Sequence, residues 1–248
     1  MMNTRRTEAI SLMKEGKYDE ALPLLLSLKK DEIKEWVLYY AVGQCYKLTG
    51  NLPFSRRFLE AAKQINCMNA ELIYVLGDVY HLSIRYEDAI RAFEDVISLY
   101  PNRIAAYNRI GVIYMQLGQV NEAESWFQKG LERIVYLKNA GIEMKQEEYN
   151  HMLNAKMEMG FVFPLRKAED TIELNFLEAV LKNNMGICHL QRKEYTSARS
   201  YFQESIDLHP GESTYDDPKI YMVEIAEMER NSKKGEDNYY IPYPQKLP

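Results

Sequence analysis

Residues 105–131 read AAYNRIGVIYMQLGQVNEAESWFQKGL, and this stretch decides the fold. Its first half carries apolar side chains at steps of three and four residues, namely Tyr107, Ile110 and Tyr114. Its second half, after a turn at 117–119, does the same with Ala123, Phe127 and Gly130. Such spacing places each set on one face of a helix, so the stretch predicts two amphipathic helices joined by a tight turn. Two helices of this length cannot bury their apolar faces on each other alone, so they require neighbours of the same kind.

The neighbours are present, because the pattern recurs every 34 residues. Gly111 is preceded at that interval by Gly77 and then by Gly43. The aligned aromatic column holds Tyr46, Tyr80 and Tyr114. The aligned small-residue column holds Ala21, Ser55, Ala89 and Ala123. A further unit near the C-terminus carries Gly186, Tyr195, Ala198, Phe202 and Pro210 in the same relative places.

A 34-residue period with these columns resembles the tetratricopeptide repeat family, over about 170 of the 248 residues. The resemblance implies an all-α fold, a right-handed α-solenoid of stacked antiparallel helix pairs. We expect one solenoid over residues 1–234, with units at about 2–35, 36–69, 70–103, 104–137 and 179–212. Within the second and third units the helices are expected at 35–47, 53–65, 70–82 and 86–99.

Residues 138–178 break this register and are expected to be irregular but helical. Gly186 follows Gly111 by 75 residues, which is two periods plus seven, or about two further helical turns. The simplest interpretation is a degenerate repeat with longer helices: residues 143–159 are compatible with a helix, 160–164 with a turn, and 168–192 with one long helix.

The C-terminal part is expected to close the array. Asp217 and Pro218 suit the N-cap and first position of a capping helix over 217–232, whose outer side we expect to be polar. Residues 235–248 contain three tyrosines and three prolines and are expected to form an extended tail. This tail either lies along the repeat surface, recruits another protein or stays disordered.

Composition narrows the functional classes. A net charge of −5 argues against nucleic-acid binding, which needs a basic footprint. No apolar run is long enough to cross a bilayer and no secretory signal is visible, so we expect a cytoplasmic protein without membrane insertion. Cys45 and Cys188 fall in an apolar column and are interpreted as small core residues with reduced thiols.

The sequence offers no catalytic constellation. It contains neither a glycine-rich phosphate loop nor a nucleophile elbow, and no residues with metal-ligand spacing, so we expect no enzyme, no cofactor and no metal. Asp78 and His81 share a helical face, but such a pair is too common to indicate catalysis. His189 stands in the tyrosine column and is interpreted as a packing substitute.

Binding is expected on the concave face, which the first helix of each unit lines. In this family that groove commonly binds an extended or helical peptide, and the resemblance implies the same here. The groove-facing columns, read by spacing, give Tyr40, Gln44, Lys47, Tyr74, Asp78, His81, Asn108, Val112, Met115, Asn183 and Ile187. One subclass of the family holds chaperone C-termini through lysine and asparagine at fixed columns. The matching columns here hold Val37, Ala41, Glu71, Val75, Ala105 and Arg109, so this clamp is absent.

The leading hypothesis is therefore a non-enzymatic adaptor or scaffold that binds another protein or peptide segment in the groove. One alternative is self-assembly into a homodimer through the irregular region or the first unit. Another is a regulator that a small ligand switches by binding in the groove.

Overall fold

The computed structural model describes residues 4–28, 35–139, 170–209 and 217–232, and within these ranges all regular structure is α-helical. The helices divide between two compact units, described separately below. The predicted helices in 143–159 and the turn at 160–164 lie outside the described residues, as does the predicted tail at 235–248. The prediction of one continuous solenoid over 1–234 stays a prediction.

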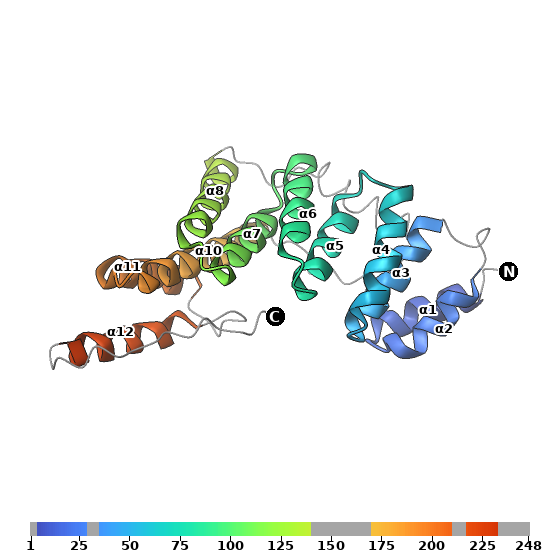
Figure 1. Ribbon diagram of the computed structural model, residues 1–248, viewed down its shortest axis with the longest axis horizontal. Helices are drawn as coiled ribbons and strands as arrows, with labels where there is room; N and C mark the ends of the chain where they lie inside the picture. The colour runs from blue at the N-terminus through green and yellow to red at the C-terminus, as the bar shows by residue number, and fades with distance from the viewer. Residues whose placement is uncertain (1–3, 29–34, 140–169, 210–216, 233–248) are drawn as a thin grey trace. The chain divides into compact units, whose positions relative to one another are not determined.

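Unit 1 consists of three antiparallel helix pairs packed in chain order (Figure 1). The helices are α1 (Thr4–Lys14), α2 (Tyr18–Ser27), α3 (Glu35–Leu48), α4 (Leu52–Ile65), α5 (Ala70–Leu82) and α6 (Tyr86–Leu99). Each pair packs on the next, because α3 contacts α2 as well as α4, and α5 contacts α4 as well as α6. The predicted helix bounds of the second and third pairs agree with these to within one residue.

Unit 2 contains α7 (Ile104–Gln116), α8 (Val120–Asn139), α10 (Asp170–Gln191), α11 (Tyr195–Leu208) and α12 (Pro218–Ser232). The deciding stretch forms the pair α7 and α8, and the predicted long helix is α10. The helix α10 packs directly on α8, and Leu181 meets Gly130 at their crossing. This arrangement repeats the way in which α5 packs on α4 in unit 1. Both units confirm the predicted all-α fold of stacked helix pairs.

The recurring glycine column marks the closest approach within each pair. A Cβ atom at Gly111 would stand 2.3 Å from Phe127 Cε1, and one at Gly77 would stand 2.8 Å from Phe93 Cε1. The pairs α3 with α4 and α10 with α11 repeat the contact through Gly43 with Leu59 and Gly186 with Phe202. The large side chain of the second helix therefore lies where any side chain on the first would stand.

A second column fixes the turn inside each pair. Gly16, Gly50 and Gly118 have φ between 73° and 82°, the left-handed region in which glycine has no Cβ penalty. The same column holds Ile84 at φ 60° and Lys193 at φ 62°. A β-branched side chain is rare there, so Ile84 carries backbone strain, and its side chain is also 73% exposed.

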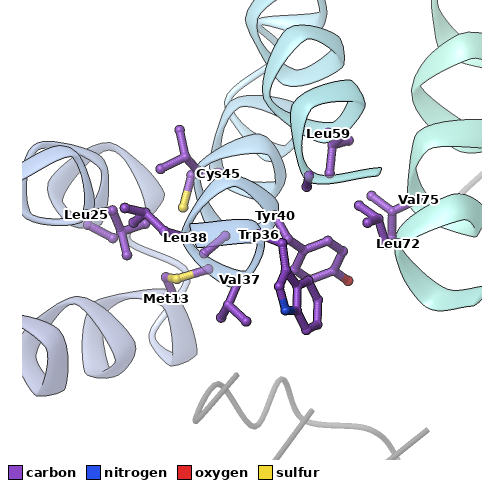
Figure 2. Close-up of a cluster of buried hydrophobic side chains, with 14 of the residues drawn as sticks. Met13, Leu25, Trp36, Val37, Leu38, Tyr40, Cys45, Leu59, Leu72 and Val75 are labelled. Atoms are coloured by element: carbon purple, nitrogen blue, oxygen red, sulfur yellow. The ribbon is translucent and has the colours of Figure 1, made fainter. Parts of the chain in front are cut away.

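The core of unit 1 runs between successive pairs (Figure 2). Met13 and Leu25 of the first pair lie against the α3 residues Leu38 and Cys45. Trp36 and Tyr40 lie side by side on α3, on the side facing α5. The helix α3 is thus buried on two faces, since each inner helix packs between two neighbours.

The helix α12 begins as predicted. The Asp217 side chain accepts a hydrogen bond from the Lys219 backbone N–H at 2.9 Å, and Pro218 occupies the first helical position. Tyr221, Ile225 and Met228 are buried against α11, where Phe202 stacks on Tyr221 at 5.1 Å. The prediction of a polar outer side is wrong in part, because Ile220 and Val223 are 58% and 60% exposed. Helical periodicity located the buried face correctly, but it does not require the opposite face to be polar.

Candidate functional site

The inner helices α3 and α5 of unit 1 bring six of the predicted groove residues together. They contribute Tyr40, Gln44, Lys47, Tyr74, Asp78 and His81. The side chains of Tyr40, Tyr74, Asp78 and His81 are buried, whereas those of Gln44 and Lys47 are half-buried. The accessible predicted groups in this unit are thus an amide and an ammonium.

Tyr40 orients the Gln44 amide through a hydrogen bond. The Gln44 Nε2 donates a hydrogen bond to the Tyr40 hydroxyl oxygen at 2.8 Å. Burial raises the pKa of the Tyr40 phenol well above its usual value, and the nearby Glu71 carboxylate raises it further. The phenol therefore stays neutral and orients Gln44 without contributing a charge.

An ion pair ties α3 to α5. The Lys47 Nζ lies 2.8 Å from the Asp78 Oδ2, and the two side chains are only 19% and 12% exposed. Because the pair is shielded from water, it is worth more than a surface pair, and losing either partner leaves a charge poorly solvated. Asp78 is thus engaged by Lys47, while the His81 ring lies 5.9 Å from that of Tyr86.

A second ion pair involves two residues that the groove prediction left out. The Arg103 Nη2 lies 3.0 Å from the Glu71 Oε2, and the guanidinium sits 4.6 Å from the centre of the Tyr74 ring. The geometry combines a salt bridge with a cation–π contact. A sequence signal existed, since both ion pairs join opposite charges about one repeat apart, 31 and 32 residues in these cases.

In unit 2 the predicted residues are mostly buried. Val112, Met115, Asn183 and Ile187 are each at most 3% exposed. Asn108 is half-buried, and its Oδ1 accepts a hydrogen bond at 2.7 Å from the Nδ2 of Asn184, which spacing had not selected. The structure therefore presents an amide pair between α7 and α10, with apolar residues packed around it.

His189 does more than fill the tyrosine column. Its ring stacks on Tyr201 at 5.0 Å, in keeping with the predicted packing role. Its Nδ1 also lies 2.5 Å from the Glu194 Oε2, and this hydrogen bond is the largest cause that lowers the pKa of the Glu194 carboxyl. Nearby, Arg192 binds Glu124 of α8 at 2.6 Å, so this polar cluster joins α10 to α8.

The three cysteines differ in their exposure to solvent. Cys45 and Cys188 are buried, which raises the pKa of each thiol to about 12 and confirms their assignment as core residues. Cys67 is exposed. Among the described residues, no three His, Cys, Asp or Glu side chains gather closely enough to hold a metal ion. None of the helices described is both long and apolar enough to span a membrane.

Comparison with known proteins agrees with this architecture. A tetratricopeptide repeat model matches residues 84–134. Human protein O-mannosyl-transferase TMTC1 is 25% identical over 229 residues, which is 78% of this chain but 25% of that protein. BBSome complex member BBS4 from Bos taurus is 25% identical over 207 residues, 82% of this chain and 37% of its own length. The chain thus spans 25% and 37% of the lengths of these two relatives.

Solved structures resemble the fold at low sequence identity. MamA from Desulfovibrio magneticus RS-1 superposes with a TM-score of 0.59 at 15% identity, over 86% of this chain and 100% of that one. Another crystal structure of MamA gives a TM-score of 0.58 at 16% identity, over 81% of this chain and 93% of its own.

The repeat columns, the paired helices and the family match agree on one assignment. Residues 84–134 match a tetratricopeptide repeat, and the stacked helix pairs have the fold of solved structures that resemble this chain.

Proposed function

We propose that this chain is a non-enzymatic interaction scaffold that binds a peptide or protein segment along its inner helices. Tetratricopeptide repeats are in general protein-interaction scaffolds, and one relative is named as a member of a protein complex. The relative TMTC1 is named as a protein O-mannosyl-transferase, but this chain spans only 25% of its length. We therefore do not propose that activity for this protein.

The observation that carries the proposal is a set of two ion pairs: one joins Lys47 of α3 to Asp78 of α5, and the other joins Glu71 of α5 to Arg103. The ion pairs hold the half-buried side chains of Lys47, Glu71 and Arg103 in position, and the hydrogen bond to Tyr40 holds Gln44. A rigid row of donors and acceptors loses little conformational entropy when it binds the backbone of a peptide. Because each charge already has a partner, the row favours a ligand that offers backbone groups and neutral side chains over a highly charged one.

The predicted tyrosines have a supporting role in this proposal. Tyr40 and Tyr74 lie beneath the polar row, where Tyr40 orients Gln44 and Tyr74 carries the Arg103 guanidinium. Substituting the buried tyrosines would therefore report on folding as much as on binding.

A photo-crosslinking experiment tests the site directly. A photoreactive amino acid at Gln44 is compared with the same amino acid at Arg57, which is exposed on α4. We expect polypeptide adducts from position 44, mapped by mass spectrometry to a short segment of the partner, and few from position 57. Equal labelling from the two positions would show that the inner face is not the binding site.

The oligomeric state distinguishes the scaffold proposal from the alternative of self-assembly into a homodimer. If position 44 crosslinks to a second copy of this chain, and light scattering gives a dimer, then self-assembly replaces the scaffold proposal. A thermal-shift screen examines the ligand-switched alternative, because a metabolite that binds the folded state raises the unfolding midpoint.

A further inference from the structure

An ion pair in unit 1 shows which flanks of successive second helices face each other. The Lys63 Nζ of α4 lies 3.0 Å from the Asp95 Oδ2 of α6. Asp95 therefore stands on the flank of α6 that faces the preceding repeat. Its equivalent in α4, 34 residues earlier, is Ala61. Because equivalent positions of stacked repeats have equivalent neighbours, the flank of α4 that carries Ala61 faces the repeat of α1 and α2.

This flank of α4 is apolar and partly exposed. Four apolar residues follow one another at steps of four, three and four residues, which places them on one face of the helix: Phe54, Phe58, Ala61 and Ile65. Phe54 is 46% and Ile65 is 50% exposed, and the two residues between them are half-buried. Tyr46 of α3 stacks on the rings of Phe54 and Phe58, with centroid distances of 5.2 and 5.7 Å, and thereby fixes both rings.

The flank of α2 that faces α4 is apolar as well. Lys63 shares its flank of α4 with Arg56 and Glu60, and the equivalents of these two residues in α2 are Leu22 and Leu26. Leu22 is half-buried, and Leu26 is 51% exposed. The six side chains on the two flanks form what we call the aromatic seam, namely Leu22, Leu26, Phe54, Phe58, Ala61 and Ile65.

Stacking of the repeats does not require this apolar surface. In the second helices of the other described repeats the position of Phe54 is polar, and it holds Glu20, Asp88, Glu122 and Ser197. In α6, Asp88 forms ion pairs with Arg85 and Arg91. An acidic residue at this position is thus compatible with the fold. Clustered apolar side chains that are exposed without being needed for packing are typical of interaction sites.

We propose that the aromatic seam binds the apolar face of a short amphipathic helix from a partner protein. All six side chains of the seam are hydrocarbons, so they offer no hydrogen bonds. A helix pairs its own backbone groups, whereas an extended peptide would lose hydrogen bonds to water here and gain none in return. A seam between two helices also suits a third helix, whose anchoring side chains recur at steps of three and four residues.

The size of the seam favours such a segment over a second copy of this chain. From Phe54 to Ile65 the helix α4 rises about 16 Å, which is three turns. Large apolar side chains bury about 150–250 Å² each when fully enclosed, so the three half-exposed residues Leu26, Phe54 and Ile65 present roughly 300 Å². A stable interface between two proteins buries about 800 Å² on each partner, which is far more.

Fluorescence anisotropy of the full-length protein with a labelled probe peptide tests the proposal. The probe is a lactam-bridged helix of about four turns, with leucines on one face at steps of four, three and four residues and with lysine and glutamate elsewhere. The control peptide has the same composition in an order that distributes the leucines around the helix. We expect saturable binding of the probe, at least about tenfold tighter than that of the control peptide.

Two variants locate the binding to the seam. Phe54→Glu introduces an acidic residue, as other repeats carry at this position, and should weaken binding of the probe by about tenfold or more while circular dichroism shows an unchanged fold. Leu26→Gln changes the opposite wall and should act in the same direction. The matched control is Leu82→Gln, at a 54% exposed position of α5, which should leave the affinity unchanged.

Several results would overturn the proposal: no saturable binding of the probe, equal binding of the two peptides, or equal affinity of both seam variants and the native protein. Tighter binding of an extended proline-rich peptide would show that the occupant is not a helix. Ile65 methyl NMR signals that shift with protein concentration alone would identify a second copy as the occupant. The seam lies on the second helices, so this outcome is independent of crosslinking from Gln44 on the inner helix α3.

Discussion

Substituting Gly111 by alanine should destabilise unit 2, although alanine is the better helix former. Intrinsic propensity alone would stabilise α7 by about 1 kcal/mol. The added Cβ would however stand 2.3 Å from Phe127 Cε1, with two further ring carbons at 2.6 and 2.8 Å. Phe127 is fully buried and cannot swing aside, so the cost of overpacking should fall near the upper end of its usual range, about 3 kcal/mol.

The net loss should therefore be about 2 kcal/mol, which for a chain of this length lowers Tm by about 4–8 °C. Urea unfolding followed by circular dichroism gives the free energy, and hydrogen exchange on α7 and α8 shows whether the loss is local to the pair.

A double-mutant cycle identifies the cause. Phe127→Leu introduces the side chain that the second pair uses opposite its own glycine, Leu59 facing Gly43. In that background Gly111→Ala should cost at least about 1 kcal/mol less than in the native protein, because the two positions are in direct contact. If Gly111→Ala is neutral or stabilising, or if the two changes are additive, the helices relax apart easily and the close crossing does not limit stability.

Three further changes test other parts of the structure. Ile84→Gly should raise the free energy of unfolding by about 0.5–1 kcal/mol, since relief of the left-handed strain exceeds the entropic cost of glycine; urea titration measures it, and a loss of stability would show that the isoleucine is not strained. Lys47→Met should cost about 1–3 kcal/mol by leaving Asp78 without its cation, and adding Asp78→Asn should recover part of the loss; without such recovery the pair is not coupled. At pH 8 a thiol reagent should modify the exposed Cys67 rapidly and the buried Cys45 only after unfolding, because a pKa of about 12 keeps the Cys45 thiol protonated. Rapid labelling of a second thiol in the native state would contradict this expectation. The raised pKa of Cys45 also means that the free energy of unfolding falls as the pH rises from 9 towards 12.

The helices were predictable because their signals are local and repeated. The bounds of α5 and α6 follow from apolar spacing and caps within a single unit, and the register of Gly77 and Gly111 states which faces meet. The burial of the inner face was not predictable in the same way. Spacing shows which side of its own helix Val112 or Ile187 lies on. How deeply neighbouring helices bury that side depends on tertiary packing, which spacing does not show.

Some polar contacts were also beyond the reach of helical spacing. Arg103 precedes α7 and lies outside any helical face, so a search restricted to helix columns misses it. A search for opposite charges about one repeat apart would have found it, because equivalent columns of successive repeats lie side by side. For Ile84 the residue type alone is misleading, because isoleucine is typical of strands and cores. Only its alignment with Gly50 and Gly118 in the repeat places it in a left-handed turn.

The ion pairs between successive repeats also bear on how freely such an array can be rearranged. Lys47 needs an aspartate in the repeat that follows it, and Lys63 pairs with Asp95 in the same manner. Deleting the third repeat or exchanging it with a neighbour would leave these charges opposite unsuitable residues. The ion pairs between successive repeats thus favour one order of the repeats. A chain with its repeats in another order would keep its helices but lose these ion pairs.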